Sequence, residues 1–246
     1  MKNLNVGIMG MGKVGNSLEQ LLRRNGVKNI FEGDKRNNLD TIRKSNVLFL
    51  TVRPKNLEEV LLQIDTLCSN DKLIISLVTG ANISNIEKYL DDFPIIRGTL
   101  NVPICIGKGT IAYFPNRNVN DQQIRYFHDM LRGPHILRVR EENMIDTSTV
   151  LVGCGPAFIS SIAQEYILFG VRNGLTVEES KQLYLSTLSG TVDMLQIYPS
   201  EDIISKVATP GGITEKGLTH LRSCNLSTTI QDSLNASYYS IPRFKD

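Results

Sequence analysis

The sequence lacks the features that mark several large classes of protein. Its longest apolar runs, such as residues 47–52 and 73–78, have the length of a buried strand and are far too short to span a bilayer. Its formal net charge of +2 gives no field of one sign that would favour nucleic acid or an anionic membrane. The N-terminus carries one lysine and passes directly into a strand pattern, without the apolar core and cleavage site of a secretory signal. We therefore expect a cytoplasmic protein that binds neither nucleic acid nor membranes.

Metal-binding and disulfide patterns are also missing. The four cysteines are far apart and contain no C-x-x-C spacing, and the three histidines form no ligand pattern with them. Buried, reduced thiols are therefore predicted in place of disulfides or a zinc site, and no metal is expected. The residues concerned are Cys68, Cys105, Cys154, Cys224, His128, His135 and His220.

The N-terminus instead carries a glycine-rich turn between a strand and a helix. Apolar residues alternate over residues 4–8, and apolar residues at helical spacing begin at Val14. Between them, residues 10–15 read G-x-G-x-x-G, in which glycines let the backbone approach a pyrophosphate at the N-terminus of a helix. A dinucleotide is the predicted ligand, and the alternative is a structural turn that binds nothing. The candidate cofactor-binding residues are Gly10, Met11, Gly12, Lys13, Val14 and Gly15.

A second group of candidate cofactor-binding residues follows the next expected strand, residues 29–33. Asp34 lies 19 residues beyond Gly15, close to the distance at which a carboxylate receives the adenosine ribose hydroxyl of NAD. Lys35 and Arg36 are bases of the type that accommodates the 2′-phosphate of NADP. The acid and the two bases predict a ribose pocket but point to different cofactors, NAD or NADP, with NADPH slightly favoured. A solvated charged turn is the alternative.

The first part of the chain alternates strands and helices. A chain of 246 residues with 41% hydrophobic and 21% charged residues is typical of a soluble globular protein of one large or two ordinary domains. Continuous apolar strands between amphipathic helices predict a Rossmann-like α/β domain over residues 1–140, with a doubly wound, mostly parallel sheet. The further expected strands are residues 46–52, 73–78, 94–97, 110–114 and 136–139, and the expected helices include residues 57–67, residues 121–131 and one opened by a capping box from Ser84 to Glu87.

From residue 141 onward no strong strand pattern appears, and residues 141–246 are predicted to form an all-helical domain. Residues 157–171 are apolar around most of the helix circumference, so this helix must be covered on all sides. A short set of helical hairpins does not cover it easily, so we expect a partner subunit; the alternative is the central helix of a monomeric bundle. Thr176 and Glu179 form a capping box that opens the next helix.

Two glycine–proline turns interrupt the helical half. Each comes directly before an expected helix and would present unpaired N–H groups to an anion such as a carboxylate. Thr214 adds a hydroxyl that can donate or accept a hydrogen bond. Either turn, taken alone, is also compatible with an ordinary helix start. The turns contain Gly153, Gly155 and Pro156 in the first case and Thr209, Gly211, Gly212 and Ile213 in the second.

Together these motifs resemble the pyrroline-5-carboxylate reductase family, the enzymes of the last step in proline synthesis, over nearly the whole chain. The glycine turn and residues 51–54 (T-V-R-P) resemble the family's first turn and its A-V-K-P segment. Residues 97–103 (R-G-T-L-N-V-P) resemble its M-P-N-T-P strand end. Residues 146–158 (D-T-S-T-V-L-V-G-C-G-P-A-F) resemble D-A-V-T-A-L-S-G-S-G-P-A-Y, and residues 207–218 resemble V-T-S-P-G-G-T-T-x-x-G-L.

The resemblance implies a Rossmann domain followed by an all-helical dimerisation domain, in a homodimer or a larger assembly. It implies hydride transfer from NAD(P)H to the C=N bond of 1-pyrroline-5-carboxylate, or of a related cyclic imino acid, to give L-proline. The implied site residues are Gly10, Gly12 and Gly15 at the pyrophosphate, Val52, Arg53 and Pro54 beside the nicotinamide, Gly211, Gly212 and Ile213 at the substrate carboxylate, Gly153, Gly155, Pro156 and Thr209 around the substrate, and Thr214 as the catalytic residue at the ring nitrogen.

Several positions depart from the family pattern. Val152, Cys154, Phe158 and Ile213 stand where the family has hydroxyl-bearing residues. Each lost hydrogen bond would weaken binding by ~0.5–1.5 kcal/mol. Residues 35–46 also look too short for the helix and strand that the family inserts there. The chain is in these respects similar to the late-competence proteins of Bacillus-like bacteria, a branch of the family, so a dinucleotide-binding dimer with a regulatory or otherwise non-proline role is the second hypothesis.

Overall fold

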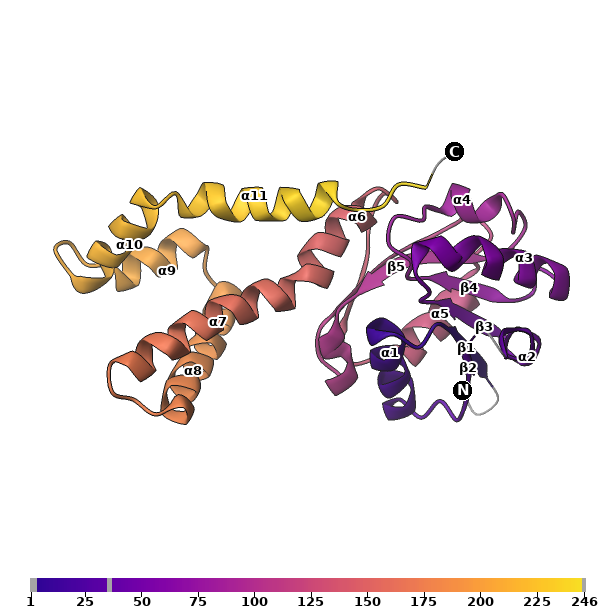
Figure 1. The fold of residues 1–246 in the computed structure, drawn as a ribbon, viewed down its shortest axis with the longest axis horizontal. Helices are drawn as coiled ribbons and strands as arrows, with labels where there is room; N and C mark the ends of the chain where they lie inside the picture. Colours follow the sequence, from indigo (N-terminus) through magenta and orange to yellow (C-terminus); the bar gives the residue numbers. More distant parts are fainter. Residues whose placement is uncertain (1–3, 35–36, 245–246) are drawn as a thin grey trace. The chain divides into compact units, whose positions relative to one another are not determined.

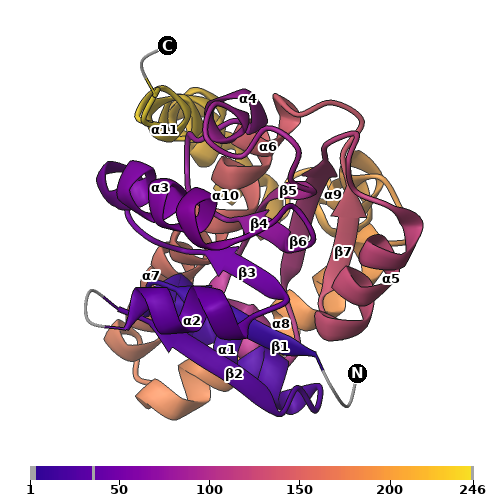
Figure 2. The ribbon, with the colours of Figure 1, turned by 90° about the vertical axis from the view of Figure 1, so that its right-hand side faces the viewer.

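The computed structural model describes residues 4–34 and 37–244 of the chain. The contacts between residues divide the chain into two compact units. One unit is Met1–Pro156 together with Ser237–Asp246, and the other is Ala157–Ala236. The first unit contains the β-sheet and the second is helical (Figures 1 and 2). This agrees with the predicted order of an α/β part and an all-helical part, while the boundary after residue 140 stays a prediction.

The described part of the chain forms one seven-stranded sheet in the order β2-β1-β3-β4-β5-β6-β7 (Figure 2). Neighbouring strands are parallel, except β5 and β6, which are antiparallel. The doubly wound, mostly parallel fold is therefore confirmed. The strand order reverses between β1 and β3, and ligands bind at the carboxyl ends of strands at such a point. The strands are β1 (Asn5–Met9), β2 (Asn29–Gly33), β3 (Val47–Leu50), β4 (Leu73–Ser76), β5 (Ile95–Leu100), β6 (Thr110–Pro115) and β7 (His135–Arg138).

Helices cover both faces of the sheet. Alternate strand residues point to opposite faces, and the buried residues divide accordingly between two hydrophobic clusters. Phe49 and Ile75 belong to a cluster with α1 and α5, whereas Leu48 and Ile74 belong to a cluster with α2, α3 and α4. The central strands β3 and β4 are buried on both faces, as their continuous apolar runs predict. The helices are α1 (Lys13–Arg24), α2 (Asn38–Lys44), α3 (Leu57–Leu67), α4 (Ile83–Glu87) and α5 (Asp121–Met130).

Helix α2 occupies the segment that was expected to be too short for an inserted helix and strand. Seven residues suffice for the helix. Ile42 is fully buried, and the Thr41 hydroxyl donates to the carbonyl oxygen of Glu32 at 3.2 Å. The described residues contain no further strand between α2 and β3, so the segment holds the helix but not both inserted elements, as expected.

The predicted capping box of α4 was also wrong. Asn82 is the N-cap, and its side-chain oxygen accepts from the Asn85 N–H at 2.8 Å. In return the Asn82 N–H donates to the side-chain oxygen of Asn85 at 3.2 Å. Asparagine supplies the same acceptor as the predicted Ser84 but two residues earlier, so the helix begins at Ile83.

The helical part of the chain contains the second capping box where it was predicted. The Glu179 N–H donates to Thr176 Oγ1 at 3.2 Å, and the Thr176 N–H donates to Glu179 Oε2 at 2.8 Å. Hydrogen bonds from the Thr176 hydroxyl and N–H hold the pKa of Glu179 below its ordinary value. The elements from α6 onward are α6 (Met144–Ser148), a π-helix (Thr149–Cys154), α7 (Gly155–Arg172), α8 (Val177–Leu195), α9 (Ser200–Val207), α10 (Ile213–Ser223) and α11 (Leu226–Tyr239).

Much of the apolar surface of α7 is exposed in the single chain. Ile162 is 52% exposed, Tyr166 62% and Phe169 70%. Residues Met144–Arg172 form one helix that is long and apolar enough to cross a membrane by length and composition alone. The apolar runs of the sequence do not reveal this stretch, because polar residues interrupt them. A helix that is covered by other protein surfaces meets the same criterion.

Candidate active site

The glycine turn joins β1 to α1 at the carboxyl edge of the sheet. Glycine is required at Gly10 and at Gly15 for different steric reasons. Gly10 has a φ of +107°, in the region that favours glycine. A Cβ on Gly15 would lie 2.2 Å from the carbonyl oxygen of Gly10, so only glycine lets α1 start against the turn. At Gly12, by contrast, no heavy atom of the described residues lies within 4 Å of a Cβ position. Space is therefore open in front of the helix.

Thr51, which was not among the predicted site residues, fixes the shape of this turn. Its hydroxyl donates to the carbonyl oxygen of Gly10 at 2.5 Å and lies 3.1 Å from that of Met9. The hydrogen bond ties the turn to the end of β3. Because the two partners are 41 positions apart in the chain, no local sequence pattern reveals the contact.

The space before α1 fits a dinucleotide pyrophosphate. Gly12 is the N-cap of α1, and within the described residues no side chain caps the helix. The first N–H groups of a helix and its positive dipole end favour an anion. Gly12 and Lys13 are exposed, and Met11 and Val14 are half-buried beside them. These residues would hold the pyrophosphate of the cofactor.

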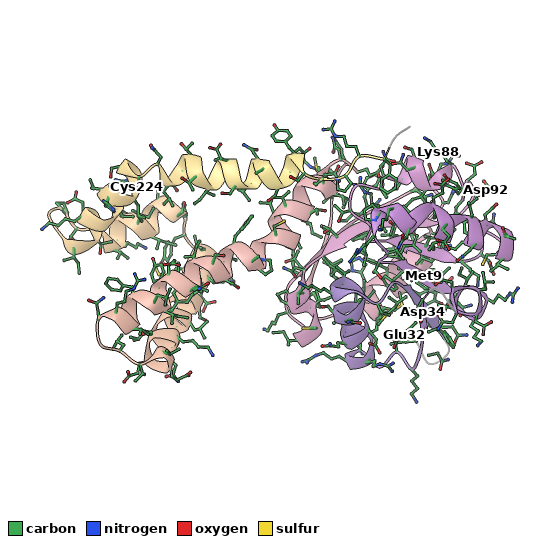
Figure 3. The ribbon with its side chains drawn as sticks, in the orientation of Figure 1. Met9, Glu32, Asp34, Lys88, Asp92 and Cys224 are labelled. Atoms are coloured by element: carbon green, nitrogen blue, oxygen red, sulfur yellow. The ribbon has the colours of Figure 1, made fainter. Side chains whose placement is uncertain are left out.

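Asp34 follows β2 directly beside the glycine turn (Figure 3). The N–H of Gly10 donates to the carbonyl oxygen of Gly33 at 3.2 Å, which brings the end of β2 against the turn. The Asp34 N–H donates to the side-chain oxygen of Asn37 at 2.7 Å, and its carboxylate accepts from the Asn37 N–H at 3.2 Å. The other two residues of the predicted ribose pocket, Lys35 and Arg36, lie outside the described residues.

The segment after β3 borders the same edge. Val52 is half-buried against the cluster under α3, Arg53 is exposed, and Pro54 begins a short 3-10 helix, Pro54–Asn56. A Cβ on Gly10 would lie 3.0 Å from the backbone nitrogen of Val52, so the glycine turn packs directly on this segment. The structure thus brings the described cofactor-binding candidates together at one edge of the sheet.

A cavity of about 330 Å³, here called the sheet-edge cavity, opens beside the glycine turn. Val14 of the turn borders it. Thr79 follows β4 and Asn101 follows β5, and both line the cavity. The carboxyl ends of parallel strands next to a dinucleotide turn are where ligands bind in sheets of this kind.

Gly153 and Cys154 of the first glycine–proline turn line the sheet-edge cavity. They do not lie before a free helix N-terminus. α6, the π-helix and α7, which starts at Gly155, run as one continuous helix. The predicted unpaired N–H groups of a helix start were therefore wrong at this turn. Pro156 has no N–H and would clash with the carbonyl four residues earlier in an α-helix, and the wider π turn accommodates it. The role of these residues at the substrate stays a prediction.

The second glycine–proline turn lies in the second unit, before α10. Gly211 has a φ of +75°, and the Gly212 N–H donates to the carbonyl oxygen of Thr209 at 2.9 Å. The carboxylate of Glu215 accepts a hydrogen bond from the Gly211 N–H at 2.5 Å. Glu215 was not predicted to take part, because its contact depends on the turn geometry. Its position shows that a carboxylate oxygen fits the amide of this turn.

Ile213 and Thr214 form the start of α10. Gly212 is the N-cap of this helix, and the described residues supply no capping side chain. Ile213 is 89% exposed, and Thr214 is half-buried. Thr214 therefore lies in the first turn of α10, three residues after Gly211, whose N–H donates to the Glu215 carboxylate.

All four cysteines are free thiols, as predicted. They are not buried, however: Cys224 is exposed at the end of α10 (Figure 3), and the other three are partly exposed. Partial burial raises the pKa of the Cys68 thiol, and the positive charge of Lys72 opposes this shift. The spacing of the cysteines in the sequence argues against disulfides, but it carries no information on whether the thiols are buried.

The chain is similar to proteins named pyrroline-5-carboxylate reductase, which confirms the resemblance seen in its motifs. Residues 142–241 match the family model described as pyrroline-5-carboxylate reductase dimerisation. The reductase of Aquifex aeolicus is 30% identical, with 94% of both chains covered, and that of Synechocystis is 29% identical over 82% of this chain and 76% of its own. A crystal structure of Plasmodium falciparum pyrroline carboxylate reductase with NADP bound is 29% identical, covers 97% of both chains and has a TM-score of 0.91. The chain belongs to the pyrroline-5-carboxylate reductase family.

Proposed function

We propose that the protein transfers hydride from NAD(P)H to the C=N bond of 1-pyrroline-5-carboxylate, or of a related cyclic imino acid, and so forms L-proline or its analogue. The observation that carries the proposal is the sheet-edge cavity beside the glycine turn, in a chain of this family. NADP in the Plasmodium falciparum reductase supports NADPH as the reductant, with NADH as the alternative. The protein acts in the cytoplasm, as a homodimer or a larger assembly.

The reaction needs positioning more than acid–base chemistry. An iminium already carries the positive charge that attracts a hydride, and well-oriented reactants can gain ~7–11 kcal/mol over free ones. The reduced nicotinamide supplies the hydride. The amides of Gly211, Gly212 and Ile213 bind the substrate carboxylate, and the Glu215 carboxylate on the Gly211 N–H supports this assignment. The Thr214 hydroxyl holds the proton of the ring nitrogen.

Oxidation of NADPH and NADH by the purified protein with 1-pyrroline-5-carboxylate tests the proposal. Turnover that depends on the imino acid is the expected result, and chromatography should identify proline as the product. Cys154 lines the sheet-edge cavity where the family has a hydroxyl, which favours the second hypothesis of a regulatory, dinucleotide-binding dimer. Tight cofactor binding without turnover of any cyclic imino acid would favour that hypothesis.

Thr214→Ala is expected to lower kcat and leave the affinity for the cofactor unchanged. A hydrogen bond to a charged group contributes ~1.5–3 kcal/mol, which corresponds to a loss in kcat of about tenfold or more. Thr214→Ser should restore most of the rate, because it keeps the hydroxyl. Thr219, an exposed threonine on the same helix, provides the control Thr219→Ala. An unaltered kcat in Thr214→Ala would remove this residue from the mechanism.

The apolar surface of α7 predicts a dimer in sedimentation experiments at micromolar concentration. Phe169, 70% exposed in the single chain, would be covered in the dimer. Phe169→Lys should therefore increase the fraction of monomer. Leu62→Lys is the control, because Leu62 is 50% exposed on α3 in the first unit. A wild-type monomer at micromolar concentration would contradict the proposed assembly.

A further inference from the structure

The last described residues of the chain belong to the first unit and pack beside its sheet. Residues 240–244, here called the C-terminal strap, follow α11 (Figure 1). The carbonyl oxygen of Pro242 lies so close to Gly80 that a Cβ on Gly80 would be 1.9 Å from it. Phe244 packs against the hydrophobic cluster that contains α3 and α4. The strap is therefore held at two points, one at the turn after β4 and one at the core.

The strap separates two cavities of the first unit. One is the sheet-edge cavity, and the other, of about 380 Å³, contains Arg97, Glu142 and Asp146. The two carboxylates are paired with the guanidinium group of Arg97. Ile241 and Pro242 line both cavities and so form the partition between them. Without the strap, the two cavities would lose the residues that they share as lining.

We propose that the C-terminal strap is a wall of the reduction site that positions the imino acid in the sheet-edge cavity. This inference rests on the proposed function. Ile241 and Pro242 add apolar surface to a cavity that is also lined by the polar residues Thr79 and Asn101. An apolar wall excludes water, which strengthens the electrostatic interactions that orient a charged substrate. The strap is a positioning element, and it determines the KM for the imino acid.

Gly80→Ala tests the strap through its anchor. The new methyl group would lie 1.9 Å from the carbonyl oxygen of Pro242, so the strap must move away from the turn after β4. Gly26→Ala is a matched control. Gly26 has the same φ of +81°, and no heavy atom of the described residues lies within 4 Å of its Cβ position. Both variants carry the same backbone strain, but only Gly80→Ala displaces the strap.

Steady-state kinetics with 1-pyrroline-5-carboxylate and NADPH provide the readout. We expect KM for the imino acid to be about tenfold higher or more in Gly80→Ala than in Gly26→Ala, because a displacement of ~1 Å can cost ~100-fold. The affinity for 2′-phospho-ADP-ribose, which lacks only the nicotinamide of NADP, should be equal in the two variants. A general loss of folded protein would lower the apparent kcat without raising KM. Equal KM values in the two variants would overturn the proposal.

A second pair of variants removes the strap without adding strain. A chain that ends at Tyr239 lacks the strap, whereas a control chain that ends at Phe244 keeps it. The shorter chain should show the same increase in KM, and an unchanged KM would overturn the proposal even if Gly80→Ala were insoluble. Absence of turnover in the wild type would instead contradict the proposed function and the strap proposal together. Turnover with a KM that does not depend on the strap would contradict only the latter.

Discussion

Replacement of Gly15 by alanine is expected to abolish tight binding of the dinucleotide. The new Cβ would lie 2.2 Å from the carbonyl oxygen of Gly10 and 3.2 Å from Thr51 Oγ1. These atoms are hydrogen-bonded to each other, so either the turn or α1 must shift. Overpacking of this kind lowers the free energy of unfolding by ~1–3 kcal/mol. The shift also moves the first N–H groups of α1 away from the pyrophosphate, and an affinity loss of about 100-fold corresponds to ~2.7 kcal/mol.

Gly12→Ala separates the two effects. Its Cβ meets no heavy atom of the described residues within 4 Å, so the free protein should keep its wild-type stability. Its affinity for the cofactor should still decrease, because the methyl group would project into the space proposed for the pyrophosphate. Calorimetric titration with NADPH and NADH, together with thermal unfolding, measures both quantities. Wild-type affinity in Gly15→Ala would show that the glycine turn is not the cofactor site.

The glycine turn could be predicted because its information is local. A strand, three glycines and a helix follow one another within about 20 residues, and each of these parts has its own recognisable residue pattern. The contact that fixes the turn, between Thr51 and Gly10, joins the ends of two strands and has no local signature. The contact of residues 240–242 with the sheet-edge cavity is of the same long-range kind, and no sequence pattern indicates it.

Prediction was weaker where one residue pattern fits two structures. Gly153 to Pro156 have the composition of a helix start, but the chain continues through a π turn into α7. α6 packs on β5 and β6. The spacing of residues in the sequence does not predict such a long-range contact, so it could not show that the helix continues through this turn. The apolar residues of α7 were recognised correctly, and their exposure in the single chain supports the predicted partner subunit.

Arg97→Met is expected to give the largest loss of stability. Arg97 lies on β5 and is 3% exposed. Its Nη1 donates to Glu142 Oε1 at 3.1 Å, and its Nη2 donates to Asp146 Oδ1. Removal of one partner from a buried ion pair costs ~3–5 kcal/mol. Because the two carboxylates remain partly exposed, we expect a decrease near the lower end, about 3 kcal/mol in the free energy of unfolding.

Lys44→Met is the control for the lost positive charge. Lys44 and Asp40 form an exposed pair at 3.4 Å on α2, and pairs of this kind contribute about 0.3–0.5 kcal/mol. Urea denaturation of both variants gives the comparison, and equal decreases in the free energy of unfolding would show that Arg97 is not a structural anchor.

The ion pairs of Arg97 with Glu142 and Asp146 also connect several elements. Glu142 accepts from the Ile83 N–H at 2.6 Å, so this cluster joins β5, α4 and the start of the helix that lines the sheet-edge cavity. Arg97→Met should therefore also raise KM for the imino acid, because the π turn and the strap that line the cavity are packed around this cluster.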